Sequence, residues 1–374
     1  MKHQGPLHGI RIVEIEGMGG APFGAMLLAD LGAEIIRIER PQDQAVSGTD
    51  PGLVMGRGRA ATISLDLKSE AGLAALHDLL DHADVATEAF RPGVAERLGF
   101  GPEQVCERNP RLVYARLTGW GREGSLARTA GHDINFIGMS GLLGAIGRSS
   151  LPPAPPLAIG GDMGGGGLFL ALGIVSALFE RERSGKGQVV DAAMVDGSAL
   201  LASAFWAYFG KGEWTTSREA NLTDGGAPFY DTYRCQDGNF VAVGALEPKF
   251  FRNLCGLVGV HYAPERQERT HWPALRKELT ERFLTRPRDE WCALAEGVDA
   301  CLSPVLDFSS APLHPQNAER EVFLELDGVT QPNASPRFSR TPSEARTSRG
   351  ESPAALLGRW GVLTETIATA TASC

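Results

Sequence analysis

The sequence predicts an α/β protein whose larger part is a Rossmann-like parallel sheet and whose smaller part is an α+β domain. Two observations predict this. Short apolar stretches alternate with helical patterns over the first 200 residues, and from Pro228 the pattern changes to a β-hairpin followed by helices. Strands that alternate with helices form a parallel sheet covered on both faces. With 374 residues, 43% of them hydrophobic, the chain has material for about two cores.

The strands of the predicted parallel sheet are short and mostly β-branched. The first is Ile10–Ile15, followed by glycines and a helical stretch from Pro22 to Leu31. Ser69 is placed to cap a second helix that runs to His82. The other expected strands are Glu34–Ile38, Thr62–Leu67, Asp84–Thr87, Leu112–Leu117 and Gln188–Met194. Long apolar helices are expected at Gly167–Arg181 and Ser198–Gly210.

The second part of the chain begins with a hairpin signal. Strand patterns at Tyr230–Arg234 and Phe240–Gly244 flank the turn Gln236–Asn239. Amphipathic helices follow at 248–258, 273–285 and 287–297. We therefore expect a large Rossmann-like domain over 1–215 and a small α+β domain over 225–315. Residues 330–374 are expected to return to the large domain and form a C-terminal tail.

Composition and charge exclude several classes of protein. The net charge of -9 argues against general nucleic-acid binding, which calls for a basic surface. The longest apolar run, Leu168–Leu178, is too short to span a bilayer, so no membrane association is expected. The six cysteines show no C-x-x-C spacing, which favours reduced residues in the cytoplasm. Arginines and lysines grouped in the first hundred residues still leave room for an anionic ligand.

Three familiar site motifs are incomplete. After the first strand, Gly17–Pro22 has proline where a dinucleotide fingerprint needs its third glycine. The segment Gly138–Gly141 lacks the glycine pattern of a nucleophile elbow around Ser140. No histidine pair has H-E-x-x-H spacing, so no metal site is indicated.

One pair of residues does suggest chemistry. His132 lies in Gly131–Phe136, and Asp162 opens a run with four consecutive glycines, Gly164–Gly167. An imidazole and a carboxyl can both carry protons near neutral pH. The glycines would remove bulk near the carboxyl and let a substrate approach, although Asp162 could also be only a helix N-cap. Backbone N–H groups at 162 and 163 are candidate donors to a developing oxyanion. The pair predicts an enzyme that removes and returns a proton without a metal or a redox cofactor.

The chain closely resembles the family III CoA-transferase superfamily and, within it, the racemases that act on 2-methylacyl-CoA thioesters. The resemblance extends over nearly the whole chain. The matching segments are Pro6–Glu14, Arg37–Pro41, Leu65–Lys68, Phe90–Val94, Glu96–Gly99, Leu117–Gly121, Gly185–Gln188, Gly225–Tyr233 and Pro336–Thr341.

The resemblance implies roles for particular residues. His132 and Asp162 would form the acid/base pair, and Glu247 would orient His132. Met163 and Gly164 would lie against the acyl group and its thioester oxygen. The residues implied to hold CoA are Arg40, Leu65, Asp66, Leu67, Lys68, Ala89, Phe90, Arg91, Arg97, Gly131, Asp133, Ile134, Asn135 and Phe136. The resemblance also implies an interlocked homodimer, with the site between the large domain of one subunit and the small domain of the other.

The function expected is interconversion of (2R)- and (2S)-2-methylacyl-CoA through an enolate, without a cofactor. The alternative is CoA transfer between carboxylic acids with Asp162 as nucleophile. A non-catalytic acyl-CoA-binding protein is a third possibility, which has no use for His132. Two features depart from the family pattern. Ala89 stands where the racemases usually have glycine, and the tail from Ala354 to Cys374 follows no family pattern.

Overall fold

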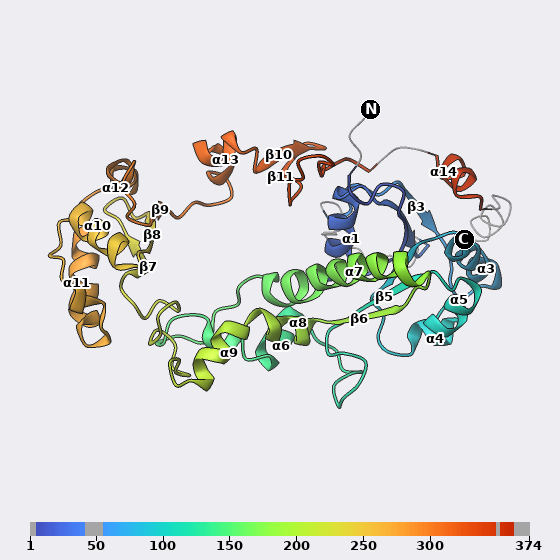
Figure 1. The fold of residues 1–374 in the computed structure, drawn as a ribbon, viewed down its shortest axis with the longest axis horizontal. Coiled ribbons are helices and arrows are strands. Elements are labelled where there is room, and N and C mark those ends of the chain that lie inside the picture. Colours follow the sequence, from blue (N-terminus) through green and yellow to red (C-terminus); the bar gives the residue numbers. More distant parts are fainter. Residues whose placement is uncertain (1–4, 42–54, 349–351, 363–374) are drawn as a thin grey trace. The chain divides into compact units, whose positions relative to one another are not determined.

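The larger unit is a six-stranded sheet with helices on both faces. A computed structural model describes residues 5–41, 55–348 and 352–362 (Figure 1). All strand pairs in this sheet are parallel, and the strand order is β3-β2-β1-β4-β5-β6. This order is that of a doubly wound Rossmann fold, whose direction reverses between β1 and β4. The prediction of a Rossmann-like parallel sheet is confirmed.

The central strands β1, β4 and β5 are buried on both faces, as is typical of parallel sheets, whereas the edge strands β3 and β6 are partly exposed. Their bounds are β1 Arg11–Ile15, β2 Glu34–Glu39, β3 Ala61–Ser64, β4 Val85–Glu88, β5 Val113–Thr118 and β6 Val189–Ala193. One face packs against α3 (Glu70–Asp81), α4 (Val94–Leu98), α5 (Pro102–Arg108) and α14 (Pro353–Trp360). The other face packs against α1 (Gly20–Asp30) and α7 (Phe169–Ser184). As predicted, the Ser69 hydroxyl caps α3 by accepting a hydrogen bond from the Gly72 N–H at 3.0 Å.

The smaller unit has its own sheet and core. β7 (Tyr230–Arg234), β8 (Phe240–Gly244) and β9 (Leu302–Pro304) form an antiparallel sheet, so the predicted hairpin is confirmed. The helices α10 (Pro248–Val258), α11 (Trp272–Phe283) and α12 (Arg288–Ala295) pack with this sheet, and their buried side chains form one core with it. The unit also contains α9 (Ser203–Gly210) and the short helices η4 (Pro264–Gln267), η5 (Arg269–His271), η6 (Ala311–Leu313) and α13 (Pro315–Glu319).

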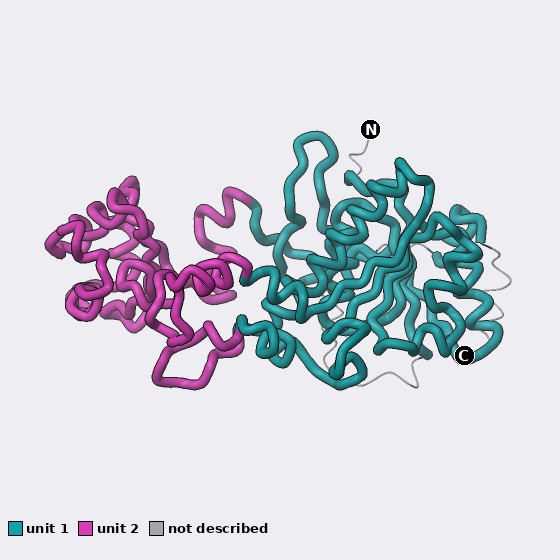
Figure 2. The backbone as a smooth tube through the Cα atoms, turned by 60° about the horizontal axis from the view of Figure 1, so that its bottom comes forward, with its two compact units in different colours: residues 1–142, 156–202, 321–374 teal, residues 143–155, 203–320 magenta. Residues whose placement is uncertain are grey.

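The chain divides into two units at different residues from those expected. Unit 1 contains 1–142, 156–202 and 321–374, and unit 2 contains 143–155 and 203–320 (Figure 2). The boundaries expected from the sequence were 1–215 for the large domain, 225–315 for the small domain and 330–374 for the return to the large domain. The chain first enters unit 2 over 143–155. It enters again after Ala202, where the predicted helix Ser198–Gly210 is divided into two helices, α8 (Met194–Leu201) and α9 (Ser203–Gly210). After unit 2, β10 (Phe323–Leu326) and β11 (Val329–Pro332) pair in unit 1. Residues 363–374 of the predicted tail lie outside the described residues.

A π-helical segment, η3 (Ile159–Leu168), precedes α7 and contains the glycine run. In this wider helix a backbone N–H donates to the carbonyl five residues before it, as the Met163 N–H does to the Ala158 carbonyl at 3.3 Å. Such segments are rare and are frequent at functional sites. By length and composition Ile159–Ser184 is apolar enough to cross a membrane. It packs instead on α1, α8 and β5 in the described part of the chain.

The glycines of η3 allow neighbouring helices to approach its backbone. A Cβ at Gly167 would collide with the Gly20 carbonyl of α1, and a Cβ at Gly197 of α8 would collide with the Gly165 carbonyl. A Cβ at Gly165 would lie 2.7 Å from the Ser198 backbone nitrogen. The glycine run therefore serves helix packing. The expectation that it clears space for a substrate is corrected for these positions.

This packing predicts a stability effect at Gly197. Gly197→Ala places a methyl group against backbone, which cannot move aside. The free energy of unfolding should therefore fall by about 2–3 kcal/mol. The matched control is Gly256→Ala in the exposed middle of α10, where a Cβ meets nothing within 4 Å. Because alanine is the better helix former, the free energy of unfolding of that variant should rise by about 0.5–1 kcal/mol. Urea unfolding of both variants measures the effects, and equal stability of Gly197→Ala and wild type would contradict the packing account.

Candidate active site

The candidate site lies at the carboxyl edge of the parallel sheet. Arg40 follows β2, Leu65–Lys68 follow β3, Ala89–Arg91 follow β4, and Gly131–Phe136 come after β5. In doubly wound sheets, ligands bind outside the carboxyl ends of the strands at the point where the strand order reverses. Here the loops after β1 and β4 meet at that point, where a Cβ on Gly17 would lie 3.0 Å from the Ala89 methyl. The predicted CoA-binding residues therefore share the edge at which this fold binds ligands.

His132 and Asp162 are brought together in unit 1. His132 is exposed and directly precedes α6 (Asp133–Met139), and its backbone N–H donates to Asn135 Oδ1 at 3.1 Å. Asp162 is half-buried in the first turn of η3, against which α6 packs. Asp162 is not an N-cap, because the residue before this helix is Ala158. The simple capping alternative is thus wrong.

The surroundings of Asp162 make its carboxyl a weak acid. Burial raises its pKa, the negative charge of Asp133 raises it further, and His132 lowers it, leaving the pKa of Asp162 at about 6. The effect of His132 on Asp162 places the two side chains within electrostatic range of each other. A carboxyl with this pKa exchanges protons readily near neutral pH.

The two amides expected to stabilise an oxyanion already have acceptors. The Asp162 N–H donates to Asp133 Oδ1 at 2.7 Å, and the Met163 N–H donates to the Ala158 carbonyl. A hydrogen bond already made within the protein must be broken before the same donor can bind an enolate. The expectation that the backbone N–H groups of 162 and 163 are free donors is therefore corrected. Met163 and Gly164 remain half-buried in the same turn.

Several predicted CoA-binding residues are instead part of the protein's own packing. Leu65 is fully buried, and its backbone N–H donates to the Glu39 carbonyl at 2.9 Å, so it is not open to a ligand in this structure. Phe136 is 5% exposed, and its ring packs edge-on against Trp120 with centroids 4.8 Å apart. Gly131 makes room for that ring, because a Cβ there would lie 2.7 Å from Phe136 Cε1. Asp133 is 6% exposed, and Asn135 closes the first turn of α6.

Other members of the predicted set lie open at the carboxyl edge. Lys68, Arg91, Arg97 and Ile134 are exposed. Arg40 is also largely exposed, and its guanidinium lies 3.5 Å from the Glu16 carboxylate at the end of β1. These cations suit the phosphates of a ligand, because they can form charge-assisted hydrogen bonds to phosphate oxygens. The exposed Arg40–Glu16 ion pair contributes little to stability, so Arg40 can leave Glu16 to bind a phosphate.

A buried charge network beneath the β4 loop was not recognised in the sequence. Glu88 is 1% exposed, lies 2.6 Å from the Arg116 guanidinium of β5, and accepts a hydrogen bond from the Phe90 N–H at 2.6 Å. Arg116 also donates to Glu96 at 2.8 Å, and that hydrogen bond lowers the pKa of Glu96 to about 2. The network fixes the Ala89–Arg91 loop. An arginine inside the apolar run Leu112–Leu117 was the signal that could have revealed it, because such a charge needs a buried partner.

Glu247, the residue expected to orient His132, lies in unit 2. It is exposed and directly precedes α10, whose first residue is Pro248. Glu247 also lies near enough to Cys301 for its charge to raise the pKa of that thiol, after the larger effect of burial.

Within the described residues, no group of three or more His, Cys, Asp or Glu side chains is placed to hold a metal ion.

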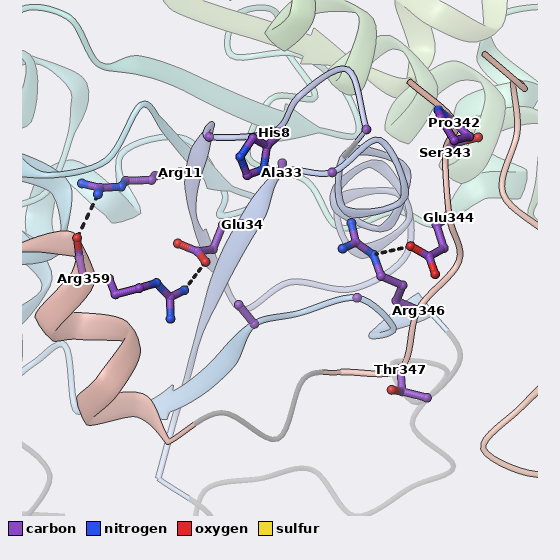
Figure 3. A pocket seen from close by; sticks show the side chains of 15 residues that line it. His8, Arg11, Ala33, Glu34, Pro342, Ser343, Glu344, Arg346, Thr347 and Arg359 are labelled. Carbon is purple, nitrogen blue, oxygen red and sulfur yellow. Dashed lines mark hydrogen bonds and ion pairs between the residues drawn. The ribbon is translucent and has the colours of Figure 1, made fainter. Parts of the chain in front are cut away.

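A large cavity in unit 1, of about 950 Å³, lies at the opposite edge of the sheet (Figure 3). Arg11 and Glu34, which begin β1 and β2, line it together with Arg359 of α14. Arg11 donates to the Arg359 carbonyl at 3.0 Å, and Arg359 pairs with Glu34, as the dashed lines show. Because its charges are paired with one another and it is far along the strands from His132 and Asp162, this cavity is not the candidate active site.

Known proteins resemble this chain over most of its length. The chain is 42% identical to alpha-methylacyl-CoA racemase of Mus musculus, covering 96% of this chain and 95% of the relative. It is 44% identical to the Homo sapiens protein of the same name, over 90% and 87% of the two chains. Among solved structures, a CAIB/BAIF family protein from Brucella suis matches with a TM-score of 0.79 and 28% identity, covering 96% of this chain and all of the other. The sequence model of CoA-transferase family III matches residues 7–354, and the chain belongs to this family.

Proposed function

We propose that this protein is a racemase that interconverts (2R)- and (2S)-2-methylacyl-CoA thioesters. The observation that carries the proposal is the placement of His132 beside a half-buried Asp162 at the ligand-binding edge of the sheet. The names of the mammalian relatives support the substrate class. The acyl chain itself is not identified by these residues.

The reaction is a proton transfer through an enolate. One of His132 and Asp162 takes the proton from the carbon beside the thioester carbonyl. The electrons of the broken C–H bond move into the carbonyl and leave negative charge on the thioester oxygen. The other residue then gives a proton to the opposite face of the carbon, and the thioester is restored. No electrons are gained or lost, so we propose that no cofactor takes part.

The pKa of Asp162 favours this reaction over CoA transfer. At a pKa of about 6, the carboxyl is present in both protonation states near neutral pH, which an acid/base residue needs in both directions. A nucleophile that attacks the thioester needs only the ionised state, and raising its pKa reduces the ionised fraction. CoA transfer with Asp162 as nucleophile remains the alternative, because the family model includes transferases.

CoA binding would hold the substrate at a distance from the reacting carbon. We propose that the exposed cations Arg40, Lys68, Arg91 and Arg97 contact its phosphates, since charge-assisted hydrogen bonds to phosphate are strong. Binding energy gained there can orient the thioester at His132 and Asp162. Met163 and Gly164 would contact the acyl side of the thioester.

We propose a homodimer in which the partner's Glu247 orients His132. The support comes from apolar helix faces that unit 1 and unit 2 leave exposed. At the end of η3 and along α7, Leu168, Leu172, Val175 and Phe179 form one stripe at helical spacing, each between 36% and 67% exposed. α9 has no buried residue although it contains Trp206 and Phe209. Apolar surface of this extent is typical of protein interfaces.

We also propose that the protein is located in the cytoplasm.

Proton exchange in heavy water tests the reaction class. Incubation of one enantiomer of a 2-methylacyl-CoA with the enzyme should give racemisation with deuterium at the α-carbon. His132→Ala should lower the exchange rate by at least about 10²-fold, because it removes a general acid/base. CoA affinity should stay nearly unchanged. Chiral chromatography and mass spectrometry measure the two products. Transfer of CoA to an added carboxylate without exchange would instead support the transferase alternative.

The raised pKa of Asp162 also predicts a pH-dependent stability effect. Because the folded-state pKa of about 6 lies above the ordinary value of 3.8, the folded state favours the protonated carboxyl. This stabilisation is complete below about pH 4 and is lost as the pH rises through 6. Asp162→Asn should therefore raise the free energy of unfolding by about 1–2 kcal/mol at pH 8, and by less at pH 5.

The control for that measurement is Glu107→Gln, which neutralises an exposed carboxyl of α5. Its effect on the free energy of unfolding should be within about 0.5 kcal/mol at both pH values. Urea unfolding monitored by circular dichroism provides the comparison. A pH-independent effect of Asp162→Asn would show that the Asp162 carboxyl does not titrate as described.

The dimer predicts a defined effect of charge on α7. Leu172→Glu should weaken self-association by at least about tenfold, because it places a carboxylate in a desolvated apolar contact. Leu284→Glu, an equivalent change at an exposed leucine that ends α11, serves as control. Sedimentation velocity over a range of concentrations measures both variants. A wild-type protein that sediments as a monomer would refute the dimer.

A further inference from the structure

One buried carboxylate joins the two segments that hold the acid/base pair. Asp133 is the first residue of α6, directly after His132, and it is 6% exposed. Its Oδ1 accepts hydrogen bonds from the backbone N–H groups of both Gly161 and Asp162, the second at 2.7 Å. The side chain of Asp133 thereby ties the start of α6 to the first turn of η3.

The close approach of Asp133 depends on a glycine. A Cβ at position 161 would lie 2.7 Å from Asp133 Oδ1, too close for a normal contact. Gly161 is therefore needed so that one oxygen can accept from two consecutive amides. Two hydrogen bonds to a charged acceptor contribute more than two neutral ones. The backbone of Asp162 is held at a fixed position relative to His132.

The second oxygen of Asp133 has a different environment. Within the described residues, Oδ2 is buried and has no hydrogen-bond partner. A buried charge without full compensation is costly, and an amide side chain could supply the same Oδ1 acceptor without that cost. Hydrogen bonding to Gly161 and Asp162 alone therefore does not account for a carboxylate at this position. Its negative charge is close enough to act on the Asp162 carboxyl.

The Asp162 carboxyl has little room to move away from this charge. A Cβ at Gly19 would lie 2.5 Å from Asp162 Oδ2 and 3.0 Å from its Cγ. The loop after β1 therefore borders the carboxyl on one side, while α6 approaches it from another. The helices α1 and α8 present Gly20 and Gly197 to η3. Among the described residues, the charged groups that shift the titration of Asp162 are Asp133 and His132, both at the start of α6.

We propose that Asp133 is a positioning residue for the proton transfer: it fixes the Asp162 backbone beside His132 and places a negative charge next to the Asp162 carboxyl. This inference rests on the proposed racemase function. It assigns Asp133 a role different from CoA binding, which the family resemblance suggested. The low exposure of Asp133 and the use of Oδ1 by two amides favour positioning.

Two variants separate the two parts of this role. Asp133→Asn keeps an oxygen acceptor for Gly161 and Asp162 and removes the charge. Asp133→Ala removes both and leaves two amides without an acceptor. We expect Asp133→Ala to lower kcat by about 10²-fold through misplacement of Asp162, with KM for the acyl-CoA within about threefold of wild type. Asp133→Asn should retain more of kcat than Asp133→Ala.

The pH profile of Asp133→Asn tests the effect of charge. Removal of a nearby negative charge should make Asp162 ionise at lower pH, so the acid limb of the kcat profile should move down by about half a unit or more. The limb belongs to the interacting pair, so its midpoint is compared only between variants. A rise in KM with unchanged kcat and an unchanged acid limb would overturn the proposal in favour of direct CoA binding.

A measurement without substrate keeps this test separate from the racemase proposal. Titration of ¹³C-labelled aspartate carboxyls by NMR, with the Asp162 signal assigned from its loss in Asp162→Asn, gives the pKa of Asp162 in wild type and in Asp133→Asn. The pKa should be about 6 in wild type and lower in Asp133→Asn. An equal pKa in both would overturn the proposal, even if the enzyme racemises its substrate. A lower pKa in an enzyme without exchange activity would support the effect of Asp133 and refute the racemase function.

Discussion

The candidate site depends on the close packing of the π-helical segment Ile159–Leu168 against its neighbours. Glycines at 20 and 167 let α1 reach its backbone, and glycines at 165 and 197 let α8 do the same. Interiors packed this closely transmit small changes in volume directly to the surrounding backbone. The position of Asp162 is therefore fixed by helices that take no part in the proposed chemistry. The Asp133 hydrogen bonds then set its position relative to His132.

The same packing explains why the pKa of the Asp162 carboxyl is raised to about 6. Burial in the first turn of the segment removes water from Asp162, and the neighbouring Asp133 opposes its ionisation. His132 offsets part of this effect. In the proposed reaction, His132 is therefore both a reacting group and one of the charges that act on the Asp162 carboxyl. The cost is stability above pH 6, where a half-buried charge must be kept, as is common at sites built for function.

Much of the fold could be predicted because the apolar strands and helical patterns are strong local signals. The parallel sheet, the cap at Ser69 and the β7–β8 hairpin follow from such signals. The π-helical segment could not be predicted, because glycine has a low helix propensity and the packing partners that compensate for it are distant in sequence. The break between α8 and α9 at Ala202 lacked glycine or proline as a signal. The short β9 strand pairs only with residues far away in the sequence.

For the site, the sequence singled out His132 and Asp162 as a candidate pair but did not show how their surroundings act on them. Residues assigned to CoA by resemblance include some with internal roles, such as Leu65 in the core and Phe136 against Trp120. Burial and hydrogen bonding, which only the fold determines, separate these from open residues such as Lys68 and Arg91. The most direct test is a crystal structure with a bound 2-methylacyl-CoA. The account predicts a His132 ring nitrogen and an Asp162 carboxyl oxygen within about 3.5 Å of the α-carbon on opposite faces. Both groups on the same face, or either one out of reach, would contradict it.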